Sequence, residues 1–175
     1  YVGELLGVPP AAGGTHLKEL RQRLTDERGT VQTIAVAIET IGGTVPELHR
    51  RFAEEVAPHG YIEPDPRVLP LISALEQQYT CWLLTNNNRT LTNKILATLG
   101  LEENFQRVIT INDTWRPKPD QEVLDQLLAE LALPPEAVLF VGDRFDIDLR
   151  LPEKRGCPVL LTQTIDELMQ LKGLL

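Results

Sequence analysis

The sequence contains little of what several common classes of protein require. Its 175 residues include two cysteines and three histidines, and none stands at a spacing typical of a metal site. Acidic residues outnumber basic ones by 25 to 17, and the net charge of −8 argues against nucleic-acid binding, which needs basic patches. No apolar run approaches the ~20 residues of a membrane span, and no secretory signal is visible. We therefore expect a cytoplasmic protein that binds no nucleic acid and no membrane, with Cys81 and Cys157 as reduced core residues.

The chain is 42% hydrophobic, enough for a packed core, and its pattern changes near residue 64. Before that point the spacing favours helices alone, predicted at residues 15–27, 30–41 and 44–57. After it, helices alternate with short apolar runs typical of buried parallel strands, predicted at residues 80–85, 107–111, 137–141 and 158–162. One of these helices is predicted at about residues 89–99, ended by Gly100, and capping boxes are predicted at Thr44 and Thr164. This alternation predicts an α/β fold with a parallel sheet and right-handed crossovers. We divide the chain into a helical domain, 1–63, and an α/β core domain, 64–175.

The most informative stretch is Val141-Gly142-Asp143-Arg144-Phe145-Asp146-Ile147-Asp148. Asp143 directly follows a predicted buried strand, and in open α/β sheets ligands bind beyond the carboxyl ends of the strands. Because two more aspartates follow within five residues, we expect three carboxylates to converge on one small volume. Such a site favours a hard cation, for which Mg²⁺ is the usual choice. A solvated acidic loop that caps the next helix is the alternative interpretation.

Two further features follow predicted strands or their loops. Thr85-Asn86-Asn87-Asn88 ends one strand, where a hydroxyl, an amide and backbone N–H groups can bind an anion. A turn with helix-capping residues is the simpler alternative for this segment. Lys118 stands between two prolines that restrict its backbone, and a positioned ammonium suits a phosphoryl oxygen. Here the alternative is a surface lysine in a proline-rich loop.

The order of these features along the chain resembles the haloacid-dehalogenase (HAD) superfamily of phosphohydrolases. Three of its four motifs are present, in its order and at its usual distances, and the resemblance covers essentially the whole chain. Bacterial response-regulator receivers share an acidic pair, a Thr and a Lys, but their acidic pair comes first, so the order excludes them. The resemblance implies a Rossmann-like core with a helical cap, and Mg²⁺-dependent hydrolysis of a small phosphorylated metabolite.

The resemblance also implies a role for each matching residue. Thr85 would hold the transferring phosphoryl group, with the backbone of Asn86 beside it. Lys118 would offset charge on the nucleophile and the phosphate. Asp143 would bind Mg²⁺, and Asp148 would support the metal shell directly or through water. The segments at residues 61–67 and 116–120 resemble the pyrimidine-nucleotidase and phosphoglycolate-phosphatase branches, which is not enough to name a substrate.

The first motif of the superfamily, Asp-x-Asp-x-Thr, is absent. Its first Asp is the nucleophile and its second the general acid and base. The earliest aspartate is Asp26, in a helical stretch, and Asp65 has no strand before it. We therefore expect an upstream segment with the nucleophile, on a strand lying between those predicted at 80–85 and 137–141. Without it those two strands pair with each other or keep unpaired edges, at about 1–3 kcal/mol per buried group.

Two other functions compete with the phosphatase hypothesis. The absent nucleophile favours a catalytically inactive HAD-like protein that serves as a binding or interaction module. Against it stands a polar set with no packing purpose, formed by Thr85, Lys118, Asp143 and Asp148. Removal of halide from a carbon acid, the reaction of the haloacid dehalogenases themselves, needs no metal, so the acidic loop favours phosphate chemistry. Neither the substrate nor the oligomeric state follows from the sequence.

Overall fold

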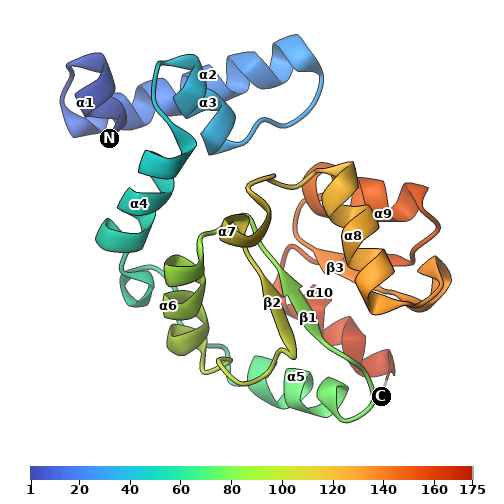
Figure 1. Cartoon of the computed structure of the whole chain (residues 1–175). Helices are drawn as coiled ribbons and strands as arrows, with labels where there is room; N and C mark the ends of the chain where they lie inside the picture. The colour runs from blue at the N-terminus through green and yellow to red at the C-terminus, as the bar shows by residue number, and fades with distance from the viewer. Residues whose placement is uncertain (175) are drawn as a thin grey trace. The chain divides into compact units, whose positions relative to one another are not determined.

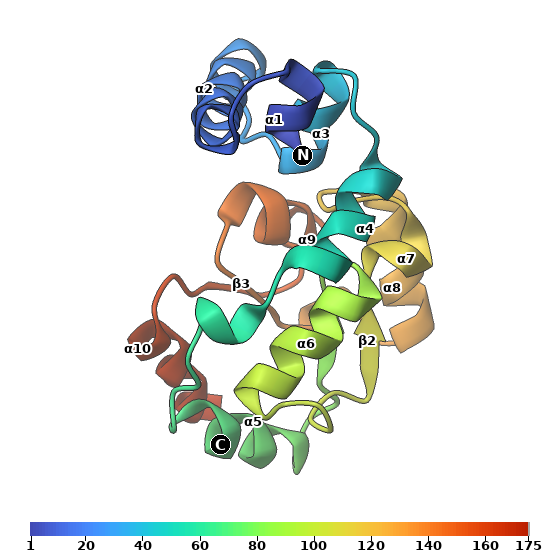
Figure 2. The same cartoon turned by 90° about the vertical axis from the view of Figure 1, so that its left-hand side faces the viewer.

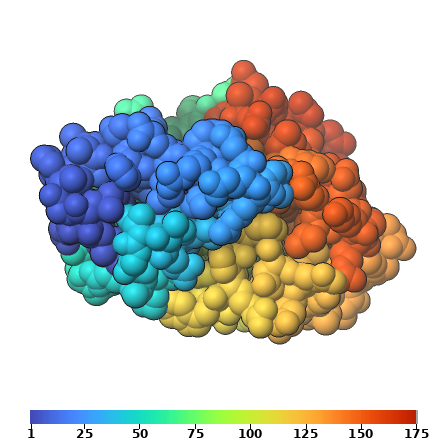
Figure 3. Space-filling view, turned by 90° about the horizontal axis from the view of Figure 1, so that it is seen from above, coloured from blue at the N-terminus to red at the C-terminus, as the bar shows by residue number. Residues whose placement is uncertain are grey.

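The structure, a computed structural model, describes residues 1–174 of the chain, which divide into two compact units, Tyr1–Val56 and Ala57–Leu175. The sequence-based division had placed this boundary between residues 63 and 64. Unit 1 provides the blue and cyan part of the surface in Figure 3. No helix of the described residues combines the length and the apolar character that crossing a bilayer requires.

Unit 1 is helical throughout, as predicted, and comprises α1 Val2–Leu6, α2 Pro10–Arg28, α3 Ile34–Thr40 and α4 Val45–Glu55. The predicted capping box of α4 is confirmed in part, because the Thr44 side chain accepts the Glu47 N–H. The Glu47 side chain accepts from Arg50 and Arg51 instead of the Thr44 N–H. The predicted start of α2 at Thr15 is wrong. The helix begins at Pro10, whose fixed φ suits a first turn, and the Thr15 hydroxyl instead donates to the Ala11 carbonyl.

Glycine permits the close contact between α1 and α2. A Cβ at Gly13 would lie 2.6 Å from the Gly3 backbone nitrogen, and one at Gly3 would lie 2.7 Å from the Val8 carbonyl oxygen. A Cβ added at the adjacent Gly14 would meet no atom within 4 Å, so the requirement for glycine applies to only one face of α2. Behind that contact, Leu20 and Leu24 of α2 pack with α3 as the core of the unit.

Unit 2 alternates helices and strands (Figure 1). Its elements are η1 Pro58–Gly60, α5 Val68–Glu76, β1 Trp82–Leu84, α6 Arg89–Leu99, β2 Arg107–Ile109, α7 Ile111–Thr114, α8 Gln121–Leu131, η2 Pro135–Ala137, β3 Phe140–Gly142, η3 Phe145–Leu149, α9 Arg150–Lys154, β4 Val159–Leu161, α10 Ile165–Leu168 and η4 Met169–Leu174. The predicted bounds of α6 are confirmed at both ends. Asn88 caps its first turn, and Gly100 ends it in the left-handed conformation at φ 69°.

The strands form two separate parallel pairs rather than one sheet. β1 pairs with β2, and β3 pairs with β4. Thr85 donates its N–H to the Ile109 carbonyl, and successive residues of a strand direct their backbone groups to alternate sides. Leu84 therefore directs its N–H and C=O away from β2. By the same reasoning Val141 faces away from β4, since Phe140 and Gly142 bond toward it.

The open sides of β1 and β3 agree with the sequence-based expectation for strands that lack a central neighbour. Within residues 1–174, each of these two strands is hydrogen-bonded to one partner strand. Val141 is 40% exposed, although it lies in the strand that leads to the acidic segment. Elsewhere in unit 2, α5 packs against η4 through the buried side chains of Leu71, Leu75 and Leu171 (Figure 2).

Candidate active site

The polar segment after β1 is both a turn and a helix cap. The Thr85 hydroxyl accepts the Asn87 N–H at 3.1 Å, and the Asn88 side chain accepts the Leu91 N–H at 2.8 Å. The simpler interpretation of this segment, a turn with helix-capping residues, is therefore correct for Asn88, which is 4% exposed. The Thr85 hydroxyl keeps its own proton to donate, so its role in the turn is compatible with holding an anion.

A network behind the turn holds this segment in place. Arg89 donates its backbone N–H to the Asn112 side chain and its guanidinium to the Val108 carbonyl and to Asp113. Asp113 also accepts from Thr110, which is 1% exposed. Burial works to raise the pKa of Asp113, but the hydrogen bonds from Thr110 and Arg89 hold it below its usual value. The carboxylate is therefore ionised and braces the loop at neutral pH.

Asn86 joins the turn to the loop that carries Lys118. Its side-chain amide donates to the Lys118 carbonyl at 3.0 Å and accepts the Lys118 N–H at 2.7 Å. The pair of bonds fixes the backbone of a residue 32 positions away along the chain. The sequence suggested the backbone of Asn86 as an anion ligand and gave no signal for this role of its side chain.

The ammonium of Lys118 lies at the carboxyl end of β1 and contacts the segment after β3. Its Nζ donates to the Leu84 carbonyl at 2.9 Å and lies 2.7 Å from Oδ1 of Asp148. The side chains are 19% and 7% exposed, so Lys118 is not the surface lysine of the alternative interpretation. Thr85, the next residue after Leu84, is thereby brought to the same edge. The structure places four of the sequence-predicted site residues in one region, namely Thr85, Asn86, Lys118 and Asp148.

Asp148 is held by the π-helical turn η3, which replaces the expected acidic loop. Its N–H donates to the Arg144 carbonyl at 2.8 Å, and its Oδ2 accepts the Arg144 N–H at 3.2 Å. The neighbours Ile147 and Leu149 are buried and anchor the turn to the core. Gly142 makes room for it, because a Cβ there would lie 2.6 Å from the Cβ of Asp148.

The three aspartates of this segment do not converge as expected. Asp148 faces Lys118, Asp146 is ion-paired with Arg150, and Asp143 is 71% exposed. Among residues 1–174, no group of three or more His, Cys, Asp or Glu side chains is arranged to hold a metal ion. The physical reason is the helical turn, which directs Asp146 and Asp148 to different basic partners, while Asp143 precedes the turn. The spacings Asp146–Arg150 and Arg144–Asp148, both i,i+4, carried that signal in the sequence.

Arg144 is a residue that the sequence reasoning missed. Its Nε lies 3.8 Å from Oδ1 of Asp143 and 3.8 Å from Oδ2 of Asp148. The two carboxylates therefore share one cation, although they differ in exposure. Two carboxylates with one open to water fit the ligands of Mg²⁺, which usually keeps several waters and takes one or two carboxylates from the protein. The remaining ligands would come from water and a phosphate oxygen.

The sequence is similar to a known protein family and to several curated proteins. Residues 6–151 match the family model of haloacid dehalogenase-like hydrolases. The glyceraldehyde 3-phosphate phosphatase of Methanopyrus kandleri is 28% identical over 119 residues, covering 65% of this chain and 51% of that protein. The phosphoglycolate phosphatase of Salmonella typhimurium is 31% identical over 113 residues, or 64% of this chain and 44% of that protein. The chain thus spans about half the length of the curated relatives it matches.

Among solved structures, the HAD-hydrolase YfnB of Bacillus subtilis, bound to magnesium, is similar with a TM-score of 0.63 and 19% identity. The match covers 97% of this chain and 86% of that one, so the likeness in fold includes both units. At this identity it shows the fold, a Rossmann-like α/β core with a helical cap. The family model covers well over half of the residues, and the chain belongs to the haloacid dehalogenase-like hydrolases.

Proposed function

We propose that this chain serves a Mg²⁺-dependent phosphatase that hydrolyses a small phosphorylated metabolite through an aspartyl-phosphate. The observation that carries the proposal is the position of Lys118, whose ammonium contacts both the end of β1 and Asp148 after β3. Through these contacts the Lys118 loop, the end of β1 and the segment after β3 lie at one edge of the core. The names of the two curated relatives, both phosphatases of small phosphorylated metabolites, support the substrate class.

Each of the site residues has a physical role in this proposal. Phosphoryl transfer depends on positioning and charge neutralisation more than on covalent chemistry by the protein. Thr85 would donate its hydroxyl to a phosphoryl oxygen, and the Asn86 N–H would bind beside it. Lys118 would neutralise charge that develops on the phosphoryl group. Asp143 and Asp148 would hold Mg²⁺, which supplies charge neutralisation at the phosphoryl oxygens when bound.

The nucleophile in this proposal is an aspartate outside the described residues, on a strand between β1 and β3. The support is the backbone of those strands. Leu84 and Val141 direct their hydrogen-bonding groups to the open sides, and Val141 is 40% exposed. A parallel strand placed there would pair with both and would end at the edge where Lys118 and Asp148 meet.

The test begins with the sequence that precedes Tyr1 in the natural protein. The proposal expects Asp-x-Asp at the end of an apolar strand there, and Mg²⁺-dependent release of phosphate by the protein that carries it. Asp143→Asn should abolish that release. Asp125→Asn should not, because Asp125 lies on α8 in an exposed ion pair with Arg155.

Two results would contradict the proposal. Unchanged activity of Asp143→Asn would remove the metal assignment. A residue other than Asp at the first position of the upstream motif would instead favour the inactive, ligand-binding HAD-like protein.

A further inference from the structure

Unit 1 contains a cavity of about 610 Å³ whose lining comes from residues 1–56 alone. This volume lies within the range of about 300–1,000 Å³ that is typical of small-molecule sites. Its apolar wall is formed by aliphatic and aromatic side chains of all four helices, among them Val2, Leu17, Ile38, Leu48 and Phe52. A ligand with an apolar body therefore fits this wall.

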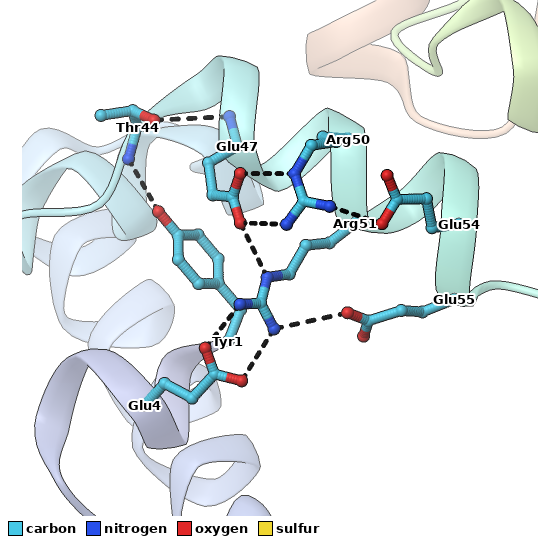
Figure 4. Close-up of polar contacts among 8 residues, drawn as sticks. All are labelled: Tyr1, Glu4, Thr44, Glu47, Arg50, Arg51, Glu54 and Glu55. Carbon is cyan, nitrogen blue, oxygen red and sulfur yellow. Dashed lines mark hydrogen bonds and ion pairs between the residues drawn. The ribbon is translucent and has the colours of Figure 1, made fainter.

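The polar part of the cavity is organised around Arg51 (Figure 4). Its guanidinium lies 2.9 Å from Glu47, 3.3 Å from Glu55 and 2.5 Å from Glu4, which it contacts through two nitrogens. One face of the guanidinium lies over the ring of Tyr1, at 5.1 Å from the ring centroid. The donors of Arg51 are thus already engaged by three carboxylates of the protein.

The charges around the cavity sum to a negative value. Hydrogen bonds from Arg50 and Arg51 lower the pKa of Glu47 to about 2, and the hydrogen bond from Arg51 lowers the pKa of Glu4. Both are ionised at neutral pH, and with Glu55 they outnumber the guanidinium of Arg51. Arg50 does not change this balance, since it pairs with Glu47 and Glu54 together.

This arrangement selects against an anion. An entering carboxylate or phosphate would have to displace Glu4 or Glu55 from Arg51 and then lie beside the remaining glutamates. A cation meets the opposite field, to which the carboxyl end of α4 contributes, since Glu55 is its last residue and the carbonyls there carry partial negative charge. The ring of Phe52, which also lines the cavity, can receive a cation on its face.

We propose that this cavity binds an organic cation with an apolar body, of the alkylammonium or arylalkylammonium class. The ligand is a small molecule of this class that occupies the cavity of unit 1 alone. The proposal concerns binding to unit 1 and stands independently of the phosphatase activity proposed above.

The test compares two probes of similar shape and opposite charge, benzylammonium and benzoate, by NMR titration of the whole chain. Benzylammonium should bind about tenfold more tightly at low salt, with shift changes at Phe52 and Leu48. The preference should shrink as salt is added, because Glu4 and Glu55 are 63% and 60% exposed. Equal or tighter binding of benzoate, or no shift change in residues 1–56 with either probe, overturns the proposal.

A matched pair of variants locates the site. Glu55→Gln removes a charge that lines the cavity and should weaken benzylammonium binding by about twofold to fivefold. Glu54→Gln is the control, since Glu54 is 57% exposed on the same helix but pairs with Arg50 and does not line the cavity. Equal weakening by both variants would mean a diffuse surface attraction and would contradict the proposal.

Discussion

Replacing Gly142 with alanine tests the geometry on which the candidate active site depends. The new Cβ would lie 2.6 Å from the Cβ of Asp148, closer than real Cβ atoms approach, and 3.2 Å from its Cγ, which is also tight. Asp148 cannot simply move aside, because hydrogen bonds to Arg144 and the buried Ile147 hold its turn. Overpacking of this kind costs about 1–3 kcal/mol. Displacement of Asp148 from Lys118, a pair at 2.7 Å, adds to that, so we expect a total of about 2–4 kcal/mol.

The assay is urea unfolding followed by tryptophan fluorescence. Both tryptophans, Trp82 and Trp115, belong to unit 2, so the signal reports the unit that contains the substitution. With a urea slope of about 2 kcal/mol/M, the midpoint should fall by about 1–2 M. Gly60→Ala is the control, because no atom lies within 4 Å of its added Cβ. A Gly142→Ala midpoint equal to that of the control would refute the argued contact.

Three further predictions follow from other contacts. Gly13→Ala should destabilise unit 1 by about 1–3 kcal/mol, because the added Cβ would clash with α1. Gly14→Ala should instead stabilise unit 1 by up to about 1 kcal/mol, because the space around the added Cβ is open. Thermal unfolding followed by circular dichroism compares the two variants, and equal effects would contradict the contact. Asn86→Ala should remove two hydrogen bonds to Lys118 and speed hydrogen exchange of the Lys118 amide, which unchanged protection would exclude. The pKa of Glu47 is about 2 in the folded protein and 4.5 in an unperturbed glutamate, so its ion pairs contribute stability above pH 4.5 that is lost as the pH falls toward 2. Glu47→Gln should therefore weaken the pH dependence of the melting temperature between pH 4.5 and 2. An unaltered pH dependence would contradict this prediction.

Local signals in the sequence predicted some helices of unit 2, and α6 is the clearest case. Residues 89–99 were predicted as a helix and form α6 with those bounds, because both of its ends are decided by adjacent residues. Asn88 caps the first turn with its own side chain, and Gly100 reaches φ 69° without strain. The capping box at Thr164 was likewise predicted and is present. Such signals act within one turn of the chain, so the rest of the fold hardly affects them.

The candidate site was less predictable, since its geometry depends on contacts between distant residues. The sequence indicated that Lys118 and Asp148 belong together, and they form an ion pair. It could not indicate that the Asn86 side chain would bond the backbone of Lys118, because nothing in either segment specifies the other. The convergence of three aspartates was a wrong prediction for a different reason. The segment was interpreted as a loop, while its i,i+4 acid–base spacing favours a helical turn.

The two contacts of Lys118 have different consequences for a strand that would lie between β1 and β3. The Leu84 carbonyl points to the open side of β1, and at present it accepts from the Lys118 ammonium. A parallel strand in that position would donate its own N–H to the same carbonyl, since this is the ladder bond that β1 lacks on that side. Lys118 would then keep its ion pair with Asp148 and turn its released N–H groups toward the end of the new strand. That is where the proposed mechanism needs a positive charge, beside an aspartate nucleophile and a phosphoryl group. A structure of the chain with such a strand in place should therefore show Lys118 beyond hydrogen-bond distance of Leu84. If the bond to the Leu84 carbonyl persisted there, Lys118 would be a structural residue and its proposed part in phosphoryl transfer would be wrong.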